Sequence, residues 1–209
     1  MIMVANTSTP ALSPNEAACV TGVPLKQVHR IIDAGLLDGA ASGARRSRAV
    51  RREGLVGLKL AHETTGLLTL DGRRRLVRYL LEHPDAAAAR ERDVSVNLRA
   101  MKGAVKKGLS TLERARAAVA CDDAVLSGAP CLKGTRIPVH DIADMLRNGD
   151  SAAAIGEAYP QISGAQIELA AFFARAYPRR GRPAREPLWR TRRASESSET
   201  SLDDALAAR

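Results

Sequence analysis

The stretch LSPNEAACVTGVPLKQVHRIIDAGLL, residues 12–37, predicts two helices joined by a short turn. Ser13 is placed to cap the first helix, Pro14 fits its first position, and Glu16 stands where a capping-box carboxylate reaches back. Gly22 ends that helix, and the second begins in VPLKQ with a proline in its first turn. Two helices joined in this way form the arrangement that places the second helix in the major groove of DNA.

The second helix is expected to have one apolar and one polar face. Leu25, Val28 and Ile32 recur at helical spacing and are expected to pack on the first helix. The residues expected to face outward are Lys26, Gln27, Arg30 and Asp33. Of these, all but the aspartate are candidate contacts to DNA.

A basic segment follows the second helix. Residues 38–53, DGAASGARRSRAVRRE, are too polar for a core and too basic for a neutral loop. We expect a wing beside the helix pair, with guanidinium groups on DNA phosphates. The candidate contacts in this wing are Arg45, Arg46 and Arg48, and the same segment also carries Arg51 and Arg52.

The charge of the whole chain agrees with a polyanionic partner. The chain has 32 Lys and Arg against 23 Asp and Glu, a net charge of +9 and a pI near 10.1. A solvated surface with an arginine bias is the competing interpretation. Because the arginines cluster directly after the predicted helix pair, their position favours nucleic acid.

Residues 12–37 also resemble the N-terminal part of MerR-like winged helix-turn-helix regulators, whose motif closes with a similar GLL before the wing. The resemblance implies a DNA-binding domain, which we place over residues 1–84. The coiled coil and effector domain usual in that family do not follow here, so its inducer chemistry is not carried over.

Residues 54–84 are expected to support the DNA-binding helices. They indicate two helices around a break rich in Thr and Gly, and Pro84 ends the second. Arg73, Arg74 and Arg75 open that second helix and are interpreted as solvated or as contacts to the DNA backbone. The side chains expected to face inward are Leu55, Leu58, Leu60, Leu76, Tyr79 and Leu80.

Residues 85–120 are expected to connect two domains. Val94, Val96 and Leu98 alternate as in a strand, whereas the periodicity of the later residues fits either a strand or a helix.

A second motif, APCLKGTRIPVHDIADML at residues 129–146, combines a glycine turn with a short extended segment. Gly134 permits a turn conformation closed to other residues. Residues 136–139 alternate like a strand, and Pro138 suits the edge of a ladder. Lys133 and Arg136 are interpreted as surface or partner-contact residues.

Three helices are expected after this turn. The first covers residues 139–147 and is closed by Gly149, and the second covers about residues 151–158. The third opens with a capping box of Ser163 and Gln166 and a hydrophobic staple of Ile162 and Ile167. The side chains expected to face inward are Ile142, Met145, Leu146, Ile167, Ala170, Ala171 and Ala174.

Residues 121–178 resemble the domain of VapB-type antitoxins catalogued as domain of unknown function 433. The likeness lies mainly in SGAPCLKGTRIPVHDI and NGDSAAAIGEAYPQIS, residues 127–142 and 148–163, although Ala and Gly replace some acidic helix residues usual in the family. The resemblance implies an antitoxin domain, placed over residues 121–177, and a VapC-like PIN-domain ribonuclease toxin whose acidic active site holds Mg²⁺. We expect this domain to form a homodimer that holds two heads on a two-fold operator, or a larger hetero-oligomer with the toxin.

Residues 178–209 are expected to form a disordered tail that orders on binding. Residues 179–193 hold seven Arg and one Glu, whereas residues 194–209 hold four acids and one Arg. An arginine-rich segment complements the acidic toxin site that the resemblance implies, because guanidinium groups pair bidentately with carboxylates. The candidate toxin contacts are Leu188, Trp189, Arg190, Arg192 and Arg193.

The same tail permits a different interpretation. RRGRP, residues 179–183, matches the core of an AT-hook, an arm that lies in the minor groove of A·T-rich DNA. A solvated basic tail is a third interpretation. Toxin binding and DNA binding can coexist because they use different arginines.

No residue pattern indicates catalysis or a cofactor. The sequence offers no acid pair, no nucleophile beside a base and no glycine loop for phosphate, and His29, His62 and His83 are isolated. Three single cysteines indicate reduced thiols and no metal site, and no signal peptide or membrane-spanning segment is expected, so we expect a cytoplasmic protein.

The sequence therefore predicts a mainly α protein with a winged helix-turn-helix domain, a small C-terminal helical domain with short strands, and a basic tail. The expected function is that of an antitoxin that inhibits a PIN-domain ribonuclease and binds operator DNA. The alternative is a stand-alone DNA-binding transcriptional regulator whose tail is an additional DNA-binding arm.

Overall fold

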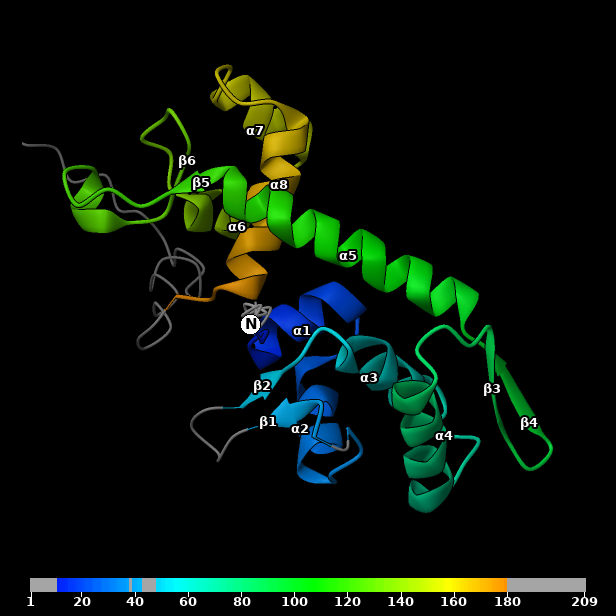
Figure 1. Ribbon diagram of the computed structural model, residues 1–209. Helices are drawn as coiled ribbons and strands as arrows, with labels where there is room; N and C mark the ends of the chain where they lie inside the picture. The colour runs from blue at the N-terminus through cyan, green and yellow to red at the C-terminus, as the bar shows by residue number, and fades with distance from the viewer. Residues whose placement is uncertain (1–10, 38, 43–47, 180–209) are drawn as a thin grey trace, which may run out of the picture. The chain divides into compact units, whose positions relative to one another are not determined.

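The computed structural model describes residues 11–37, 39–42 and 48–179, and within these ranges it is mainly helical with small antiparallel sheets (Figure 1). Backbone contacts divide the chain into two units, residues 1–178 and residues 179–209. Only Arg179 of the second unit is described, so the elements below all belong to the first.

The first two helices, α1 (Pro14–Thr21) and α2 (Leu25–Asp33), lie where the sequence predicts them. The capping box of Ser13 and Glu16 is present, and Gly22 closes α1 with a φ of 73°. On α2, Val28 and Ile31 are buried and Ile32 packs partly against the same core. The inward assignment of Leu25 is wrong, because its side chain is 39% exposed. Leu25 begins the helix, and its side chain leans toward the N-terminal end, where no earlier turn covers it.

A small sheet follows α2. Strand β1 (Ala41–Ser42) pairs antiparallel with β2 (Ala49–Val50), and residues 43–47 between them lie outside the described ranges. Val50 also exchanges two backbone hydrogen bonds with Leu12, both 2.8 Å long. This bridge fixes the segment before α1 to the base of the β1–β2 pair.

Helices α3 (Gly54–Glu63) and α4 (Leu70–Glu82) form the expected pair around the Thr and Gly break. The predicted core leucines of both helices are buried. Tyr79 was also assigned inward, and this was wrong: it is 39% exposed and stacks on His83, with 4.4 Å between the ring centroids. The buried face of α4 runs through Leu76, Val77 and Leu80, which leaves Tyr79 at its margin.

The region expected to connect two domains holds a hairpin and the longest of the described helices. Strands β3 (Ala88–Glu91) and β4 (Val94–Asn97) pair antiparallel, as the alternation of residues 94–98 predicts, except that Leu98 is the N-cap of the next helix. That helix, α5 (Arg99–Ala117), resolves the ambiguous periodicity in favour of a helix. It crosses α1 so closely that a Cβ on Gly108 would lie 2.1 Å from the carbonyl oxygen of Val20.

The C-terminal part begins with β5 (Val119–Ala120), a 3-10 turn η1 (Leu126–Gly128) and β6 (Cys131–Leu132), which pairs antiparallel with β5. The strand expected over residues 136–139 is replaced by an isolated bridge between Cys131 and Pro138. Proline cannot donate to a ladder and suits the start of a helix. Pro138 accordingly occupies the N-cap position of the next helix, and the paired strand of this segment, β6, lies earlier in the chain.

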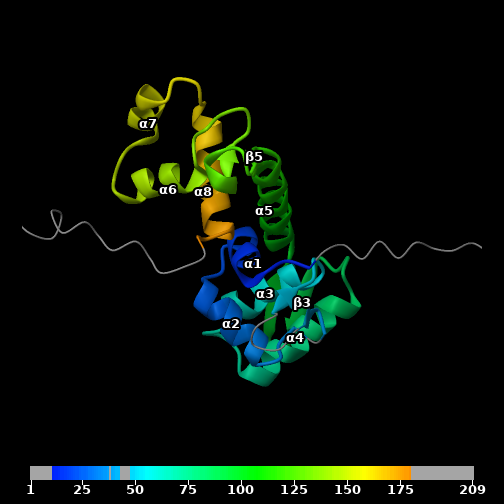
Figure 2. The same ribbon diagram turned by 90° about the vertical axis from the view of Figure 1, so that its left-hand side faces the viewer.

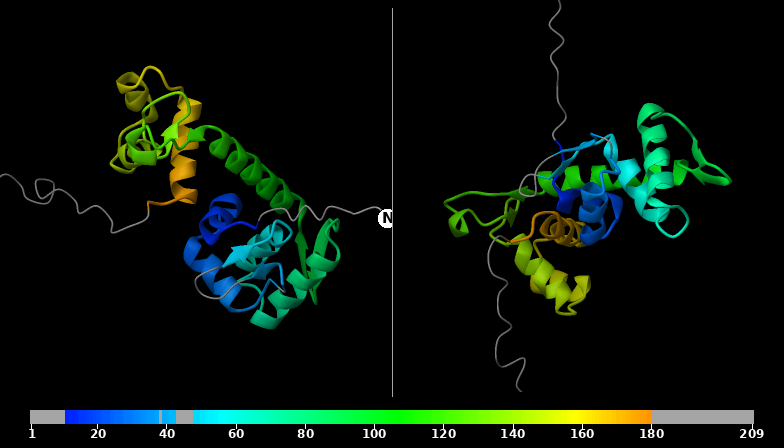
Figure 3. Two further views of the ribbon diagram at one scale, coloured as in Figure 1. Left: turned by 60° about the vertical axis from the view of Figure 1, so that its left-hand side comes forward. Right: turned by 90° about the horizontal axis from the view of Figure 1, so that it is seen from below.

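Three helices complete the unit, close to the expected bounds. They are α6 (Val139–Arg147), α7 (Ala152–Ala158) and α8 (Gly164–Ala176), and the capping box of Ser163 and Gln166 opens α8. Figure 2 shows α8 beside α5, with α1 next to both. In Figure 3, α4 and the β3–β4 hairpin lie at the opposite end of this unit from α6 and α7.

A single apolar cluster joins the two halves of this unit. It contains Val20 of α1, Val28 of α2, Leu58 of α3, Leu112 of α5 and Phe172 of α8. The expected segments 1–84, 85–120 and 121–177 therefore share one compact unit, in which α5 contacts helices on both sides. Their separation into domains stays a prediction.

Candidate nucleic-acid interface

The outward face of α2 carries two cations. Lys26 and Arg30 are exposed and four residues apart, whereas Gln27 between them is half-buried. Neither cation forms an ion pair with another residue in the described ranges. Residues at this spacing lie one turn apart on the same face of a helix, so both side chains can reach one strand of a polyanion.

Arg48 joins the β1–β2 pair to α2. Its guanidinium lies 3.0 Å from His29 Nδ1 and 2.5 Å from Asp33 Oδ1, and its side chain is only 15% exposed. Because the guanidinium only donates, His29 Nδ1 accepts, which places the proton of the neutral ring on Nε2. The guanidinium of Arg48 is thus paired within the protein, with two residues of α2. These contacts fix Arg48, the residue before β2, against that helix.

Cations from α3 and α4 contact the C-terminal ends of α1 and α2. Lys59 Nζ donates to the carbonyl of Thr21 at 3.1 Å, and Arg74 Nη2 donates to the carbonyl of Ala34 at 3.1 Å. A cation at the C-terminal end of a helix satisfies free carbonyls and interacts favourably with the helix dipole. Hydrogen bonds from α3 and α4 therefore fix the C-terminal ends of both helices of the candidate interface.

The other two arginines at the start of α4 also have partners within the protein. Arg73 Nη1 donates to the carbonyl of Ala61 at 3.3 Å and to Thr65 Oγ1 at 3.1 Å. Arg75 pairs with Glu91 of β3, with its Nε 2.9 Å from Glu91 Oε1. These contacts support the interpretation that α3 and α4 act as a scaffold.

A buried carboxylate connects α1 to α5 and to the end of α8. Glu16 is 6% exposed, and its Oε1 accepts hydrogen bonds from Arg116 Nη2, at 2.6 Å, and from the Tyr177 hydroxyl. Burial alone would raise the pKa of Glu16, but the hydrogen bonds from Tyr177, Arg116 and Ser13 outweigh it and hold the pKa below its ordinary value. The carboxylate that caps α1 thus also ties it to α5 and α8.

The remaining candidate residues fall into two groups. Lys133 and Arg136 are exposed, as expected, and Arg136 lines a cavity of about 320 Å³ beside β6. The candidates outside the described residues are Arg45, Arg46, Leu188, Trp189, Arg190, Arg192 and Arg193. Within the described ranges, no group of three or more His, Cys, Asp or Glu side chains is placed to hold a metal ion.

Sequence reasoning missed the residues that position the candidate interface. Lys59 and Arg74 belong to helices later in the chain, and the partners of Glu16 lie 100 and 161 residues away. Asp33 offered a partial signal, because a carboxylate on the helix face expected to meet DNA calls for a nearby cation.

None of the described helices has an apolar stretch long enough to cross a membrane.

Comparison with known proteins identifies a family domain and a similar protein. Residues 119–174 match the family model described as protein of unknown function (DUF433). The chain is also 31% identical over 187 residues to a protein of Sinorhizobium fredii (strain NBRC 101917 / NGR234) named "Uncharacterized protein y4eO". That alignment covers 82% of this chain and 83% of the relative, and no solved structure matches. The chain therefore belongs to the same family as y4eO and carries a DUF433 domain at residues 119–174.

Proposed function

We propose that the N-terminal part of this protein is a winged helix-turn-helix that binds DNA, and that the whole chain is an antitoxin that represses its own operon. The observation that carries the DNA-binding proposal is the outward face of α2, where Lys26 and Arg30 are exposed on a helix held at its C-terminal end by Arg74.

The dimensions of the head fit this role. An α-helix with its side chains is about 10–12 Å across and the major groove is about 12 Å wide, so a helix such as α2 fits inside it. Arg48 holds the start of β2 beside α2, which supports the proposal that the segment between β1 and β2 acts as a wing. Arg45 and Arg46, together with Lys26 and Arg30 of α2, are the proposed phosphate contacts, and Gln27 is a further proposed DNA contact on α2.

The antitoxin role is supported by the resemblance of residues 121–178 to VapB-type antitoxins. The proposed partner is a VapC-like PIN-domain ribonuclease in the cytoplasm, and the protein acts as a homodimer or in a hetero-oligomer with that toxin. Arg190, Arg192 and Arg193 pair with the acidic residues of the toxin, and Leu188 and Trp189 fill an adjacent apolar pocket. The protein itself performs no catalysis in this proposal.

A stand-alone transcriptional regulator is the second candidate, and the RRGRP sequence at residues 179–183 favours it. In that case the tail binds A·T-rich DNA in the minor groove. A neighbouring reading frame for a small nuclease with an acidic active site favours the antitoxin instead.

Two experiments test the proposal. DNA binding is measured by fluorescence anisotropy with a fragment from upstream of the gene and a scrambled fragment of equal length; equal affinities at physiological salt would contradict operator binding. Antitoxin activity is measured by co-expression with the neighbouring nuclease, using the full chain and a chain that lacks residues 178–209. Growth rescue by the full chain alone is expected, whereas rescue by both chains would contradict the role of the tail.

A further inference from the structure

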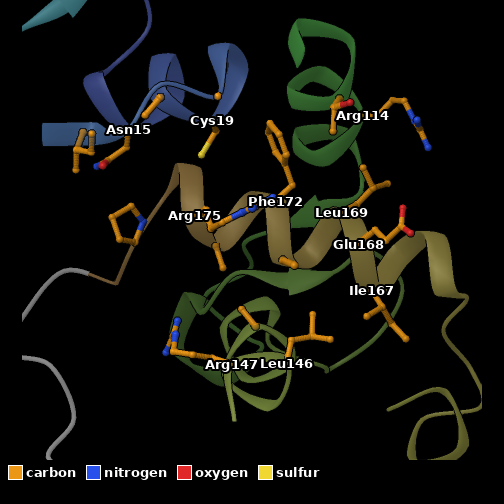
Figure 4. A pocket seen from close by; sticks show the side chains of 18 of the residues that line it. Asn15, Cys19, Arg114, Leu146, Arg147, Ile167, Glu168, Leu169, Phe172 and Arg175 are labelled. Carbon is orange, nitrogen blue, oxygen red and sulfur yellow. The ribbon is translucent and has the colours of Figure 1, made fainter. Parts of the chain in front are cut away.

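A large groove lies between helices of the N-terminal part, residues 1–84, and those of the DUF433 domain. It is lined by residues of α1, the turn before α2, α5, α6 and α8, and its volume is about 1270 Å³ (Figure 4). Figure 4 shows Phe172 directed from α8 into the space between α1 and α5, with Leu146 and Arg147 of α6 on another side. The proposed DNA contacts Lys26 and Arg30 are not among its lining residues.

The floor of the groove is apolar. Leu146 and Leu169 are half-buried, Phe172 is 9% exposed, and Leu25 at the start of α2 is 39% exposed. The side chain of Leu25 was expected in the core but lies at this groove instead. These side chains leave apolar area that a partner could remove from water, at about 25 cal/mol for each Å².

The rim of the groove is positively charged. Lys107 and Arg114 of α5 and Arg175 of α8 are exposed, and none of the three has an ion-pair partner within the described ranges. Arg175 lies over the ring of Phe172, with its guanidinium carbon 5.7 Å from the ring centroid. Glu168 is the only acid among the described lining residues. The occupant that complements this rim carries negative charge.

The size of the groove corresponds to a short helix. An α-helix with its side chains is about 10 Å across and rises about 1.5 Å per residue, so roughly ten residues occupy the volume of this groove. Amphipathic helices dock in apolar grooves through residues spaced three and four apart, while their polar face meets the rim. A helix that fits this groove is therefore apolar on one face and acidic along the edges of that face.

We propose that this groove docks an acidic amphipathic helix of a partner protein. Leu25, Leu146 and Phe172 receive its apolar face, and Lys107, Arg114 and Arg175 pair with its carboxylates. A nucleic acid is the less favoured occupant, because its phosphates would cover the apolar floor without burying apolar surface of their own. The proposal does not depend on DNA binding or on the role of the tail.

The test uses the full chain and two labelled probes in fluorescence anisotropy. One probe is a designed helical peptide with leucine at every third and fourth position and glutamate elsewhere, and the other carries lysine in place of each glutamate. The groove variant is Lys107→Glu/Arg114→Glu. The matched control is Arg99→Glu/Lys106→Glu, which makes the same change of charge at exposed positions of α5 that do not line the groove.

The acidic probe is expected to bind the wild type, and the lysine probe to bind at least about tenfold more weakly. The groove variant and Leu25→Ala should each weaken binding of the acidic probe, and the control variant should not. Equal loss in both double variants, or no binding of the acidic probe, would overturn the proposal.

Three other results would assign the groove to a different occupant and also overturn it. One is a groove variant that weakens only binding of a short DNA duplex. Another is a groove variant that converts a dimer to a monomer in light scattering, which identifies a second copy of the chain. The last is a synthetic peptide of residues 194–209 that binds more tightly than the designed probe.

Discussion

Arg116 on α5 donates to the carboxylate of Glu16 on α1 at 2.6 Å, across 100 residues of sequence. The same carboxylate caps the first turn of α1 through the backbone N–H of Ser13, at 2.7 Å. The side chain of Glu16 therefore both caps α1 and fixes this helix to α5.

Replacement of Glu16 by Gln should destabilise the protein by about 2 kcal/mol, because it removes charge-assisted hydrogen bonds from a buried site. The measurement is the free energy of unfolding in urea. The matched control is Glu113→Gln, which removes the exposed ion pair with Arg52 and should cost less than about 1 kcal/mol. Equal losses in the two variants would show that the hydrogen bonds of Glu16 contribute no more to stability than an exposed ion pair.

The stability contributed by Glu16 should disappear in acid. Its pKa is lowered in the folded protein, so the unfolded state takes up the proton first as the pH falls. The contribution is complete above the ordinary carboxyl pKa near 4.5 and is lost as the pH falls through the lower folded value. The difference in unfolding free energy between wild type and Glu16→Gln should therefore shrink as the pH falls below that ordinary value. A difference that stays constant over this range would contradict the assignment.

The close crossing of α1 and α5 depends on Gly108. Its replacement by Ala should destabilise the protein by about 1–3 kcal/mol, because the new Cβ would lie against the backbone of Val20. Gly103→Ala in the same helix meets no atom within 4 Å and should stabilise by up to about 1 kcal/mol. Thermal unfolding of both variants measures the contrast, and a Gly108→Ala variant as stable as wild type would show that the helices separate easily.

The role of Arg48 can be separated from that of a phosphate contact. Arg48→Ala should weaken DNA binding, because the wing loses its attachment to His29 and Asp33. Its salt dependence should stay that of the wild type, since no phosphate contact is removed. A direct contact would instead lower the slope of log K against log salt by about 0.9, which titrations at several salt concentrations can resolve.

Local signals in the sequence predicted much of the fold. The capping boxes at Ser13 and Ser163, and Pro160 shortly after the end of α7, act on residues within about one turn of a helix end, so they mark helix ends reliably. The alternation of residues 94–97 likewise predicted β4.

What failed depends on contacts between distant segments. Leu25 and Tyr79 have the spacing of core residues, but the neighbouring helices determine which side of α2 and α4 is covered. The ambiguity of residues 99–117 could not be resolved from their pattern, because α5 is buried only along a narrow line against α1, α3 and α8. The contacts Arg48–Asp33, Lys59–Thr21 and Glu16–Arg116 join residues 15, 38 and 100 positions apart, and spacing carries no information about such pairs.

The most direct test of the central claim is the salt dependence of DNA binding by Lys26→Ala/Arg30→Ala. If the outward face of α2 contacts phosphates through both cations, the slope of log K against log salt falls by about 1.8 relative to wild type. Lys106→Ala, which removes an exposed cation of α5, should leave the slope unchanged. A double variant with the affinity and slope of wild type would contradict DNA binding by this helix.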